Sequence, residues 1–389
     1  MIRITDKTKC CGCTACASIC PKQCIQMKAD EEGFIYPVID FSKCVDCGMC
    51  EAVCPELSDS YKHSFQVKTF VVRDKRVDVL KNSTSGGVFS SVMEYVIAKS
   101  GAVYGVIIDE DNVVKHIRVD SIEDKKVKKI PCSKYVESEI RDIFHCVKTD
   151  LDEDILVCFS GTPCQIAGLK SYLKKEYDNL ITIDVVCRGN ASPLFWKKYV
   201  EYQEKKFGGR LIDTRFRNKT YGYHSGTMKL VFDNGKEYYA SARTNLFLRA
   251  FFKDLCSRPS CYACSFKGAE HSSDLTLYDS WHASELCGIK DDDNGYTNVI
   301  VQSEKGALLL HSLAAALQIY PAETQKAIEL DGIMVNNSIQ WNPAREHFFK
   351  KINDDDLEQH CMKFFKIHIK DHLIEKLKKY YYFKKLIGK

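Results

Sequence analysis

The sequence contains no apolar stretch as long as the roughly 18 residues that a membrane-spanning helix needs. Its first residues, Met1 to Lys7, also lack the apolar run of a secretory signal peptide. These two absences argue against a membrane-spanning or secreted protein. We therefore expect a cytoplasmic chain, and its 389 residues are enough for two or three domains with cores of their own.

Two nucleotide-binding fingerprints are missing as well. Neither G-x-G-x-x-G nor G-x-x-x-x-G-K-[ST] occurs in the sequence. These motifs supply the glycine-rich loops that cradle phosphates in dinucleotide-binding Rossmann domains and in P-loop proteins. The sequence therefore predicts neither kind of domain.

A continuous basic face for nucleic acid is also lacking. Residues 1–60 carry six Lys or Arg against nine Asp or Glu, whereas residues 363–389 carry nine Lys against two acidic residues. With a net charge of +4 for the whole chain, the part between these ends is neutral in sum. We expect an acidic N-terminal module, a separate basic tail and no nucleic-acid partner.

Cysteine is abundant, and the N-terminal cysteines form one motif twice. The first run ends at Pro21 and the second at Pro55, and both read C-x2-C-x2-C-x3-C-P. In bacterial two-cluster ferredoxins with this run, the fourth cysteine of each run binds the other cluster. We assign one [4Fe-4S] cluster to Cys10, Cys13, Cys16 and Cys54, and a second to Cys20, Cys44, Cys47 and Cys50.

Two other interpretations of these cysteines fit less well. A zinc site needs four thiolates in two pairs, not two interleaved quartets that each end in proline. A secreted disulfide scaffold conflicts with the free thiolates that clusters need, which indicate a reducing compartment. Cys11 and Cys24 lie beside the ligands, and we expect them to pack against the clusters rather than bind them.

The rest of the chain predicts a mixed α/β region. Strands are expected at 70–72, 103–108, 155–159, 181–186 and 274–278, and a helix over 88–97. A polar linker covers about 58–64. We expect four parts, with boundaries at 1–61 for the ferredoxin domain, 65–150 and 151–320 for the two halves of the α/β region, and 321–389 for a helical tail.

Four further cysteines fall in loops. Cys164 and Cys187 each follow a predicted strand, at the edge where α/β sheets keep their ligand sites. Cys261 and Cys264 form a C-x2-C pair, and Cys256 is an alternative member of the set. Three interpretations remain open: a third [4Fe-4S] cluster, a zinc site, or unrelated buried cysteines.

A small-residue turn, Ser83-Thr-Ser-Gly-Gly87, opens the predicted helix over 88–97. Such a turn leaves backbone N–H groups free to hold an anion, for instance the phosphate of a cofactor. Taken alone, however, a serine N-cap followed by glycines more often serves simply to begin a helix.

Taken in order, these motifs resemble the coenzyme F420 hydrogenase/dehydrogenase beta-subunit family, in the form fused to an N-terminal two-cluster ferredoxin. The resemblance covers about residues 1–315. The segments that carry it are Gly33-Phe-Ile-Tyr-Pro37, Ser83-Thr-Ser-Gly-Gly-Val-Phe89, Val103-Tyr-Gly105, Gly161-Thr-Pro-Cys-Gln165, Asp184, Cys187-Arg-Gly189, Ser192-Pro193, Ser260-Cys-Tyr-Ala-Cys264 and Asp279-Ser-Trp281.

The resemblance implies FAD beside a third [4Fe-4S] cluster, and therefore a mixed α/β flavin-binding domain after the ferredoxin domain. It implies that the flavin is surrounded by Ser83, Thr84, Ser85, Gly86, Gly87, Thr162, Gln165, Asp279 and Trp281. Hydrogenase and dehydrogenase members exchange hydride with a deazaflavin, one relative reduces a chlorophyll intermediate, and many bacterial members accompany genes for surface polysaccharide synthesis.

The sequence departs from the family pattern in two places. Where the family usually has Cys-His-Gly, this chain has Cys187-Arg-Gly189, and where it usually has Gly-Asp-x-Trp-Gly, this chain has Tyr278-Asp-Ser-Trp-His282. A fixed positive charge on Arg188 near a cluster or the flavin would favour the reduced form. The departures put the hydride partner in doubt but leave the cysteines intact.

Clusters move single electrons, whereas flavins move one or two. The sequence thus predicts an oxidoreductase that exchanges electrons with an external donor or acceptor protein, such as ferredoxin or a reductase, and acts on a small-molecule substrate. The alternatives are a deazaflavin-dependent oxidoreductase and an electron-transfer subunit that feeds a partner enzyme. Candidate proton donors are His271, His282 and Asp279, although Asp279 is expected to hydrogen-bond the cofactor or the backbone rather than to transfer protons.

Candidate substrate contacts are Tyr223 and His224 in a glycine-punctuated loop, and Arg243 as an anion-binding residue. The tail from Lys363 to Lys389 alternates apolar and basic residues. Its favoured interpretation is a solvated helix with one packed face, and the alternative is a helix that contacts an acidic membrane surface or a partner.

Overall fold

The structure is a computed structural model that describes residues 1–57, 65–353 and 356–387. The predicted linker over 58–64 lies outside the described residues.

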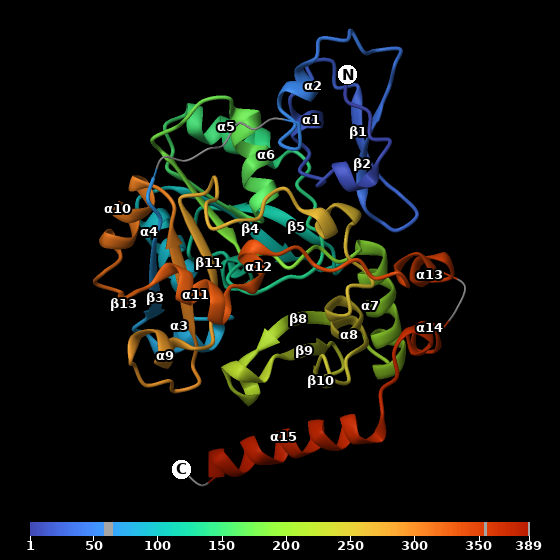
Figure 1. Ribbon diagram of the computed structural model, residues 1–389, viewed down its shortest axis with the longest axis vertical. Coiled ribbons are helices and arrows are strands. Elements are labelled where there is room, and N and C mark those ends of the chain that lie inside the picture. The colour runs from blue at the N-terminus through green and yellow to red at the C-terminus, as the bar shows by residue number, and fades with distance from the viewer. Residues whose placement is uncertain (58–64, 354–355, 388–389) are drawn as a thin grey trace.

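The N-terminal module contains one hairpin, two short α-helices and the 3-10 helix Lys7–Lys9. The strands β1 (Ile25–Ala29) and β2 (Ile35–Ile39) lie between the two cysteine runs and pair antiparallel. The helices α1 (Ala15–Ser18) and α2 (Met49–Ala52) each begin after a residue in the left-handed conformation. The module occupies one end of the molecule, next to α5 (Ile143–Asp152) and α6 (Pro163–Leu173) (Figure 1).

An eight-stranded sheet forms the centre of the α/β region. Its strand order is β13-β3-β12-β11-β7-β6-β4-β5. The strands are β3 (Lys68–Asp74), β4 (Ala102–Ile108), β5 (Val114–Val119), β6 (Val157–Gly161), β7 (Leu180–Val185), β11 (Leu275–Ser280), β12 (Tyr296–Val301) and β13 (Leu317–Ala322). The four central strands β4, β6, β7 and β11 run parallel, and antiparallel strands extend both edges.

Helices cover both faces of this sheet because successive side chains of a strand point to opposite sides. Val103 and Ile107 of β4 belong to a core with α4 (Val88–Ala98) and α10 (Glu304–Ser312). Ala102 and Tyr104 of the same strand belong to a second core with α5 and α6. Helices α3 (Val77–Asn82), α9 (Ala283–Cys287), α11 (Thr324–Asp331) and α12 (Ile333–Asn336) lie around the sheet.

A second sheet of three antiparallel strands lies beside the first (Figure 1). Its strands are β8 (Leu211–Asn218), β9 (Thr227–Phe232) and β10 (Glu237–Ser241). Aromatic side chains join them to α7 (Pro193–Phe207), α8 (Leu246–Phe252), α13 (Arg345–Lys350) and α14 (Leu357–Phe364) in one core. The last helix, α15 (Ile369–Ile387), crosses this end of the molecule.

The mixed α/β class predicted from the sequence is confirmed. The domain boundaries remain predictions, since strands on both sides of residue 150, and β13 across residue 320, share one sheet. None of the described helices is long and apolar enough to cross a membrane.

Candidate functional site

All 20 cysteines are free thiols in the structure. The motif predicts two ligand sets within the N-terminal module, and that assignment stays a prediction. Burial raises the pKa of Cys16 to about 12, and the charges of Cys10 and Cys54 raise it further, which places these three thiols near one another. We call Cys10, Cys13, Cys16 and Cys54 set one.

The other quartet surrounds a small cavity. Set two consists of Cys20, Cys44, Cys47 and Cys50, and all four line this cavity. Cys24 lines it as well, with its sulfur 3.3 Å from that of Cys20. Cys47 is exposed, so set two reaches the surface of the module.

The four loop cysteines also lie together, and we call them set three. Cys164 is in the first turn of α6, Cys187 follows β7, and Cys261 and Cys264 lie in and after the short helix Pro259–Ala263. Burial is the main reason why the pKa of Cys187 is raised to about 12. The charge of Lys267 opposes this effect, and the charges of Cys164 and Cys264 add to it. Burial raises the pKa of Cys261 as well, and the charge of Cys187 is the next cause.

Cys11 joins set one to set three. Its buried thiol is within hydrogen-bonding reach of both Cys13 and Cys164. Cys256, the alternative member of set three, lies instead in the aromatic core, where the charge of Cys361 acts on it. Within the described part of the chain, no group of three or more His, Cys, Asp or Glu side chains is found that could hold a metal ion.

A cavity of about 970 Å³ opens beside set three, and Cys187 is part of its wall. The predicted flavin-contacting residues that line it are Ser83, Thr84, Ser85, Gly87, Thr162, Gln165, Asp279 and Trp281. These residues come from the turn before α4, the end of β6 and the end of β11, so the sheet brings three distant segments to one cavity. Gly86 lies just behind, where its N–H donates to Thr297 Oγ1 at 2.9 Å.

The turn before α4 is held from behind by Lys219. Its ammonium donates to the carbonyls of Leu80 at 2.7 Å, Ser85 at 2.6 Å and Asn294 at 2.6 Å. A Cβ at Gly86 would come within 2.5 Å of the Val72 carbonyl oxygen, so only glycine fits at that position. Lys219 was not a sequence candidate, because nothing near it in the sequence indicates which carbonyls it reaches.

Asp279 is bound to the protein rather than free. It forms an ion pair with Arg217 and accepts a hydrogen bond from the Tyr223 hydroxyl at 2.9 Å. The Arg217 guanidinium lies 4.4 Å from the centre of the Trp281 ring, and Tyr223 stacks on Trp281 at 4.5 Å. Arg217 thereby fixes both the aspartate and the tryptophan that face the cavity.

The candidate proton donors His271 and His282, and the candidate substrate contact His224, are not among the residues that line the cavity, and each lies against a carboxyl group. His271 Nδ1 is 2.8 Å from Asp184, and both residues are buried. His282 Nδ1 is 2.7 Å from Asp331, and His224 Nε2 is 2.7 Å from Asp291. The structure therefore gathers the flavin-contacting residues at the cavity and leaves these three histidines outside its wall.

Two polar groups of the wall have no hydrogen-bond partner among the described residues. They are the Tyr278 hydroxyl and Arg188 Nε, both buried. The remaining guanidinium nitrogens of Arg188 contact Asp254 at 2.7 Å, the Phe252 carbonyl at 3.1 Å and the Met334 sulfur at 3.8 Å. A polar group bound in the cavity would satisfy the two open positions.

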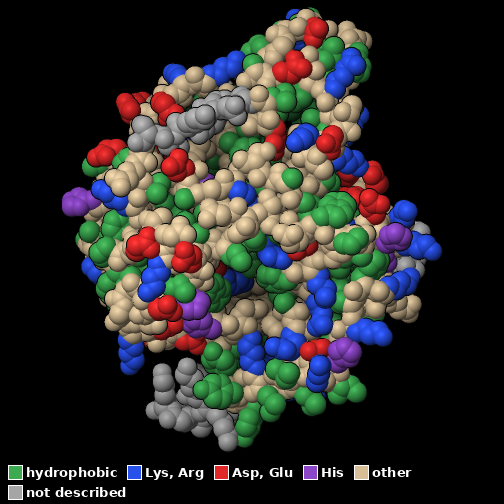
Figure 2. Space-filling view, viewed as in Figure 1, with side chains coloured by type: hydrophobic (Ala, Val, Ile, Leu, Met, Phe, Trp, Pro, Cys, Tyr) green, Lys and Arg blue, Asp and Glu red, His purple; other side chains and the backbone are tan. Residues whose placement is uncertain are grey.

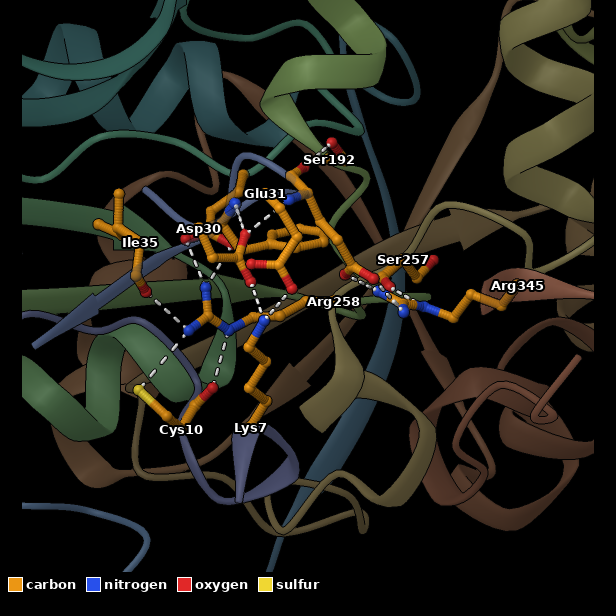
Figure 3. A network of polar contacts seen from close by, with 12 residues as sticks. Lys7, Cys10, Asp30, Glu31, Ile35, Ser192, Ser257, Arg258 and Arg345 are labelled. Atoms are coloured by element: carbon orange, nitrogen blue, oxygen red, sulfur yellow. Dashed lines mark hydrogen bonds and ion pairs between the residues drawn. The ribbon is translucent and has the colours of Figure 1, made fainter. Parts of the chain in front are cut away.

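The N-terminal module is fastened to the α/β region by Arg258, which is fully buried (Figure 3). Its guanidinium donates to both Glu137 oxygens at 2.8 Å, to the Ile35 carbonyl at 2.8 Å and to the Cys10 carbonyl at 2.7 Å. It also reaches the Cys10 sulfur at 3.5 Å. One arginine thus connects the junction between the two parts directly to a thiol of set one.

A second buried arginine supports the same junction. Arg345 pairs with both oxygens of Glu32 and donates through Nε to the Ser257 carbonyl at 2.9 Å. Ser192 donates to the Glu32 carbonyl, and it also caps α7. Figure 3 shows Arg258 and Arg345 reaching the module from neighbouring positions.

Comparison with known proteins identifies two segments. Residues 155–326 match the family model for the C terminus of the coenzyme F420 hydrogenase/dehydrogenase beta subunit, and residues 9–57 match the 4Fe-4S dicluster domain. The expected resemblance is confirmed, as is the iron–sulfur character of the N-terminal domain. No curated protein matches the chain.

Among solved structures, a chain of the F420-reducing [NiFe] hydrogenase complex from Methanosarcina barkeri is similar to this one. It is 15% identical in sequence, with a TM-score of 0.44. The match covers 76% of this chain and 90% of that chain.

Proposed function

We propose that this chain is an iron–sulfur flavoprotein oxidoreductase. It matches the models of a 4Fe-4S dicluster domain and of the C terminus of the coenzyme F420 hydrogenase/dehydrogenase beta subunit. It passes electrons between an external redox protein and a small organic substrate. Sets one, two and three hold [4Fe-4S] clusters, and FAD occupies the cavity of about 970 Å³.

The observation that carries this proposal is the serial arrangement of the thiols. Set two contains the exposed Cys47, and set one follows it within the module. Cys11 then lies between Cys13 of set one and Cys164 of set three. Because Cys187 of set three lines the cavity, the series runs from the surface to the cavity wall.

The cavity suits a cofactor of the size of FAD. Its volume lies at the upper end of the range of about 300 to 1,000 Å³ that is usual for small-molecule sites. The turn from Ser83 to Gly87 offers polar backbone at the start of α4, where a phosphate is favoured. Trp281 supplies an aromatic wall, and the open Tyr278 hydroxyl and Arg188 Nε offer hydrogen bonds.

Bound FAD would supply both one-electron and two-electron chemistry, and the clusters one-electron transfer. The residues of the chain bind these groups and orient the wall of the cavity. Lys219 holds the turn that borders the cavity, and Arg217 holds Asp279 and Trp281. The partner protein docks near the exposed Cys47 end, away from the cavity.

The test is single-turnover reduction of the bound flavin under anaerobic conditions, with photoreduced ferredoxin as the donor. We expect rapid bleaching of the flavin in the wild type and a much slower reaction in Cys187→Ser. A Cys146→Ser variant serves as the control, because Cys146 lies outside all three sets. Equal rates in Cys187→Ser and the wild type would contradict a role for set three between the module and the cavity.

A second candidate is suggested by the matched family, which is described by coenzyme F420. In that case the reducible partner is a deazaflavin, which exchanges hydride with the bound flavin. Adding reduced coenzyme F420 to the oxidised protein and following the deazaflavin absorbance separates the two. A rise in oxidised deazaflavin favours the second candidate, and an unchanged spectrum leaves the first.

The substrate class follows from the resemblance alone. We propose a small organic molecule in surface polysaccharide synthesis, such as a sugar or its carrier. Deletion of the gene should then change the glycan profile of the cell surface. An unchanged profile would contradict this setting without affecting the proposed redox chemistry.

A further inference from the structure

The polar side of α15 faces the protein. Glu375 accepts hydrogen bonds from the Ser241 N–H at 2.9 Å and the Ser241 hydroxyl at 2.7 Å, and it is buried. Lys378 donates to the Ser225 carbonyl and to Thr227 Oγ1. Asp371 is buried as well. A surface helix normally turns its apolar stripe inward, so α15 is inverted relative to that rule.

The opposite side of α15 exposes apolar side chains. Ile369 is 81% exposed, Leu373 54%, Leu377 64% and Tyr381 66%. These residues are spaced four apart, so they form one stripe along the helix. In Figure 2, hydrophobic and basic side chains gather at the end of the molecule where α15 lies.

The charge on this outward side is of one sign. The two acidic residues of α15, Asp371 and Glu375, are buried against the protein. Lys370 and Lys376 are exposed. Residues 363–389 carry nine Lys in all. An apolar stripe with only positive charges beside it is typical of a helix that lies in a membrane interface.

We propose that α15 docks the protein on the surface of a bilayer that contains anionic phospholipid. The apolar stripe enters the boundary between headgroups and acyl chains, and the lysines meet the negative headgroups. A second copy of the chain would bring two positive faces together, which is unfavourable. An acidic redox partner at this site would be at the opposite end of the molecule from the N-terminal module (Figure 1).

Docking places the cavity next to the bilayer. Asp371 of α15 lines the cavity. Ser225 and Ser241, which α15 holds by hydrogen bonds, line it too. The helix therefore orients that end of the cavity toward the membrane surface. This inference does not depend on the redox chemistry.

The experiment is flotation of the full-length protein with vesicles, using either phosphatidylcholine alone or an equal mixture of phosphatidylcholine and phosphatidylglycerol. We expect binding to the mixed vesicles only, weakened by high salt. The double variant Leu373→Glu/Leu377→Glu should bind the mixed vesicles at least about tenfold more weakly than the wild type, because two apolar side chains no longer enter the bilayer. Both positions are exposed, so the fold should be retained, and an unchanged circular dichroism spectrum checks this.

The matched control is Leu308→Glu on α10, where the leucine is 61% exposed. It changes the same residue type at the same exposure on another helix and should bind as the wild type does. Failure of the wild type to bind the mixed vesicles would overturn the proposal. So would equal binding by the α15 variant, or a stable dimer in solution that only the α15 variant dissociates.

Discussion

Arg258 is the single residue on which the junction between the module and the α/β region depends most. It is fully buried and pairs with the buried Glu137. A Cβ at Gly12 would come within 2.8 Å of both partners, so the loop of set one fits tightly around the pair. The guanidinium is also the one group from outside the module that reaches the Cys10 sulfur among the described contacts.

Replacing Arg258 by Gln should therefore have two effects. The cluster held by set one should become harder to reduce, because hydrogen bonds and positive charge at a ligand sulfur favour the reduced form. The variant should also lose about 3–5 kcal/mol of stability, since Glu137 stays buried without its partner. Redox titration followed by electron paramagnetic resonance measures the first effect, and chemical denaturation the second.

The control for Arg258 is Arg141→Gln. Arg141 forms an exposed ion pair with Glu139, which is worth about 0–1 kcal/mol. In the Arg141→Gln variant, the midpoint potential of the set-one cluster and the stability of the protein should match those of the wild type. A midpoint potential in the Arg258 variant equal to that of the wild type would show that Arg258 has no influence on the cluster.

His116 is buried beside the cavity wall. Ser138 donates to its Nδ1 at 3.2 Å, and its Nε2 donates to the Ser160 carbonyl at 3.1 Å. Burial lowers the pKa of His116 to about 4, with Lys134 adding to the effect and the Ser160 carbonyl opposing it. Above pH 6.5 the residue is neutral in both the folded and the unfolded chain. Below it, the unfolded chain takes up a proton first.

Stability should accordingly fall as the pH drops from 6.5 to 4, by roughly 3 kcal/mol from this residue. In His116→Gln this contribution disappears, so the variant should lose less stability over the same range. Denaturation at successive pH values measures the difference. His347→Gln, at an exposed position, is the control, and a His116→Gln slope as steep as the wild-type slope would refute the assignment.

The helix α6 is the element that brings the thiol sets together. Its first turn carries Cys164, and Gly168 in its second turn lies against Cys13. A Cβ at Gly168 would lie 2.7 Å from the Cys13 Cβ and 2.9 Å from its sulfur. The close approach of set one to set three thus requires glycine at this position.

Gly168→Ala should push α6 away from the module. Overpacking of this kind costs about 1–3 kcal/mol, and flavin reduction through the module should slow while the flavin is retained. Stopped-flow reduction by photoreduced ferredoxin measures the rate. Ser171→Ala, on the same helix and with a hydroxyl that makes no hydrogen bond among the described residues, should react as the wild type does. Unchanged rates in Gly168→Ala would argue against this route.

Elements of the parallel sheet could be predicted because each combines an apolar run with a turn signal. The strands expected at 103–108 and 181–186 are found as β4 and β7. The antiparallel strands β12 and β13 were not predicted, because their place in the sheet depends on pairing with β3, more than 200 residues earlier in the chain. Thr162 and Gln165 show why a motif does not identify a site residue by itself. Both line the cavity, but they also form a capping box at the start of α6, which is a structural role.

The residues that hold the site could not be read from the sequence for the same reason. Arg258 meets Glu137 and Cys10, and Lys219 meets Ser85, across more than 100 residues in each case. A lone arginine or lysine carries no local signal of its partner. The cysteine motifs, by contrast, are local patterns and could be recognised directly.

At the scale of the whole molecule, the chain has two ends with different tasks. The acidic module with its exposed Cys47 lies at one end, and the basic helix α15 lies at the other (Figure 1). The cavity lies between them, and both Cys187 of set three and Asp371 of α15 line it. We therefore propose that electrons enter at one end and that the other end meets the membrane surface.

The most direct test of the proposed function is the cofactor content, measured as iron, sulfide and flavin per chain after anaerobic purification. Three [4Fe-4S] clusters and one FAD per chain predict about 12 irons and about one flavin. Cys187→Ser should fall to about 8 irons, whereas Cys146→Ser should keep about 12. About 8 irons and no flavin in the wild type, after careful reconstitution, would contradict both the third cluster and the flavin site.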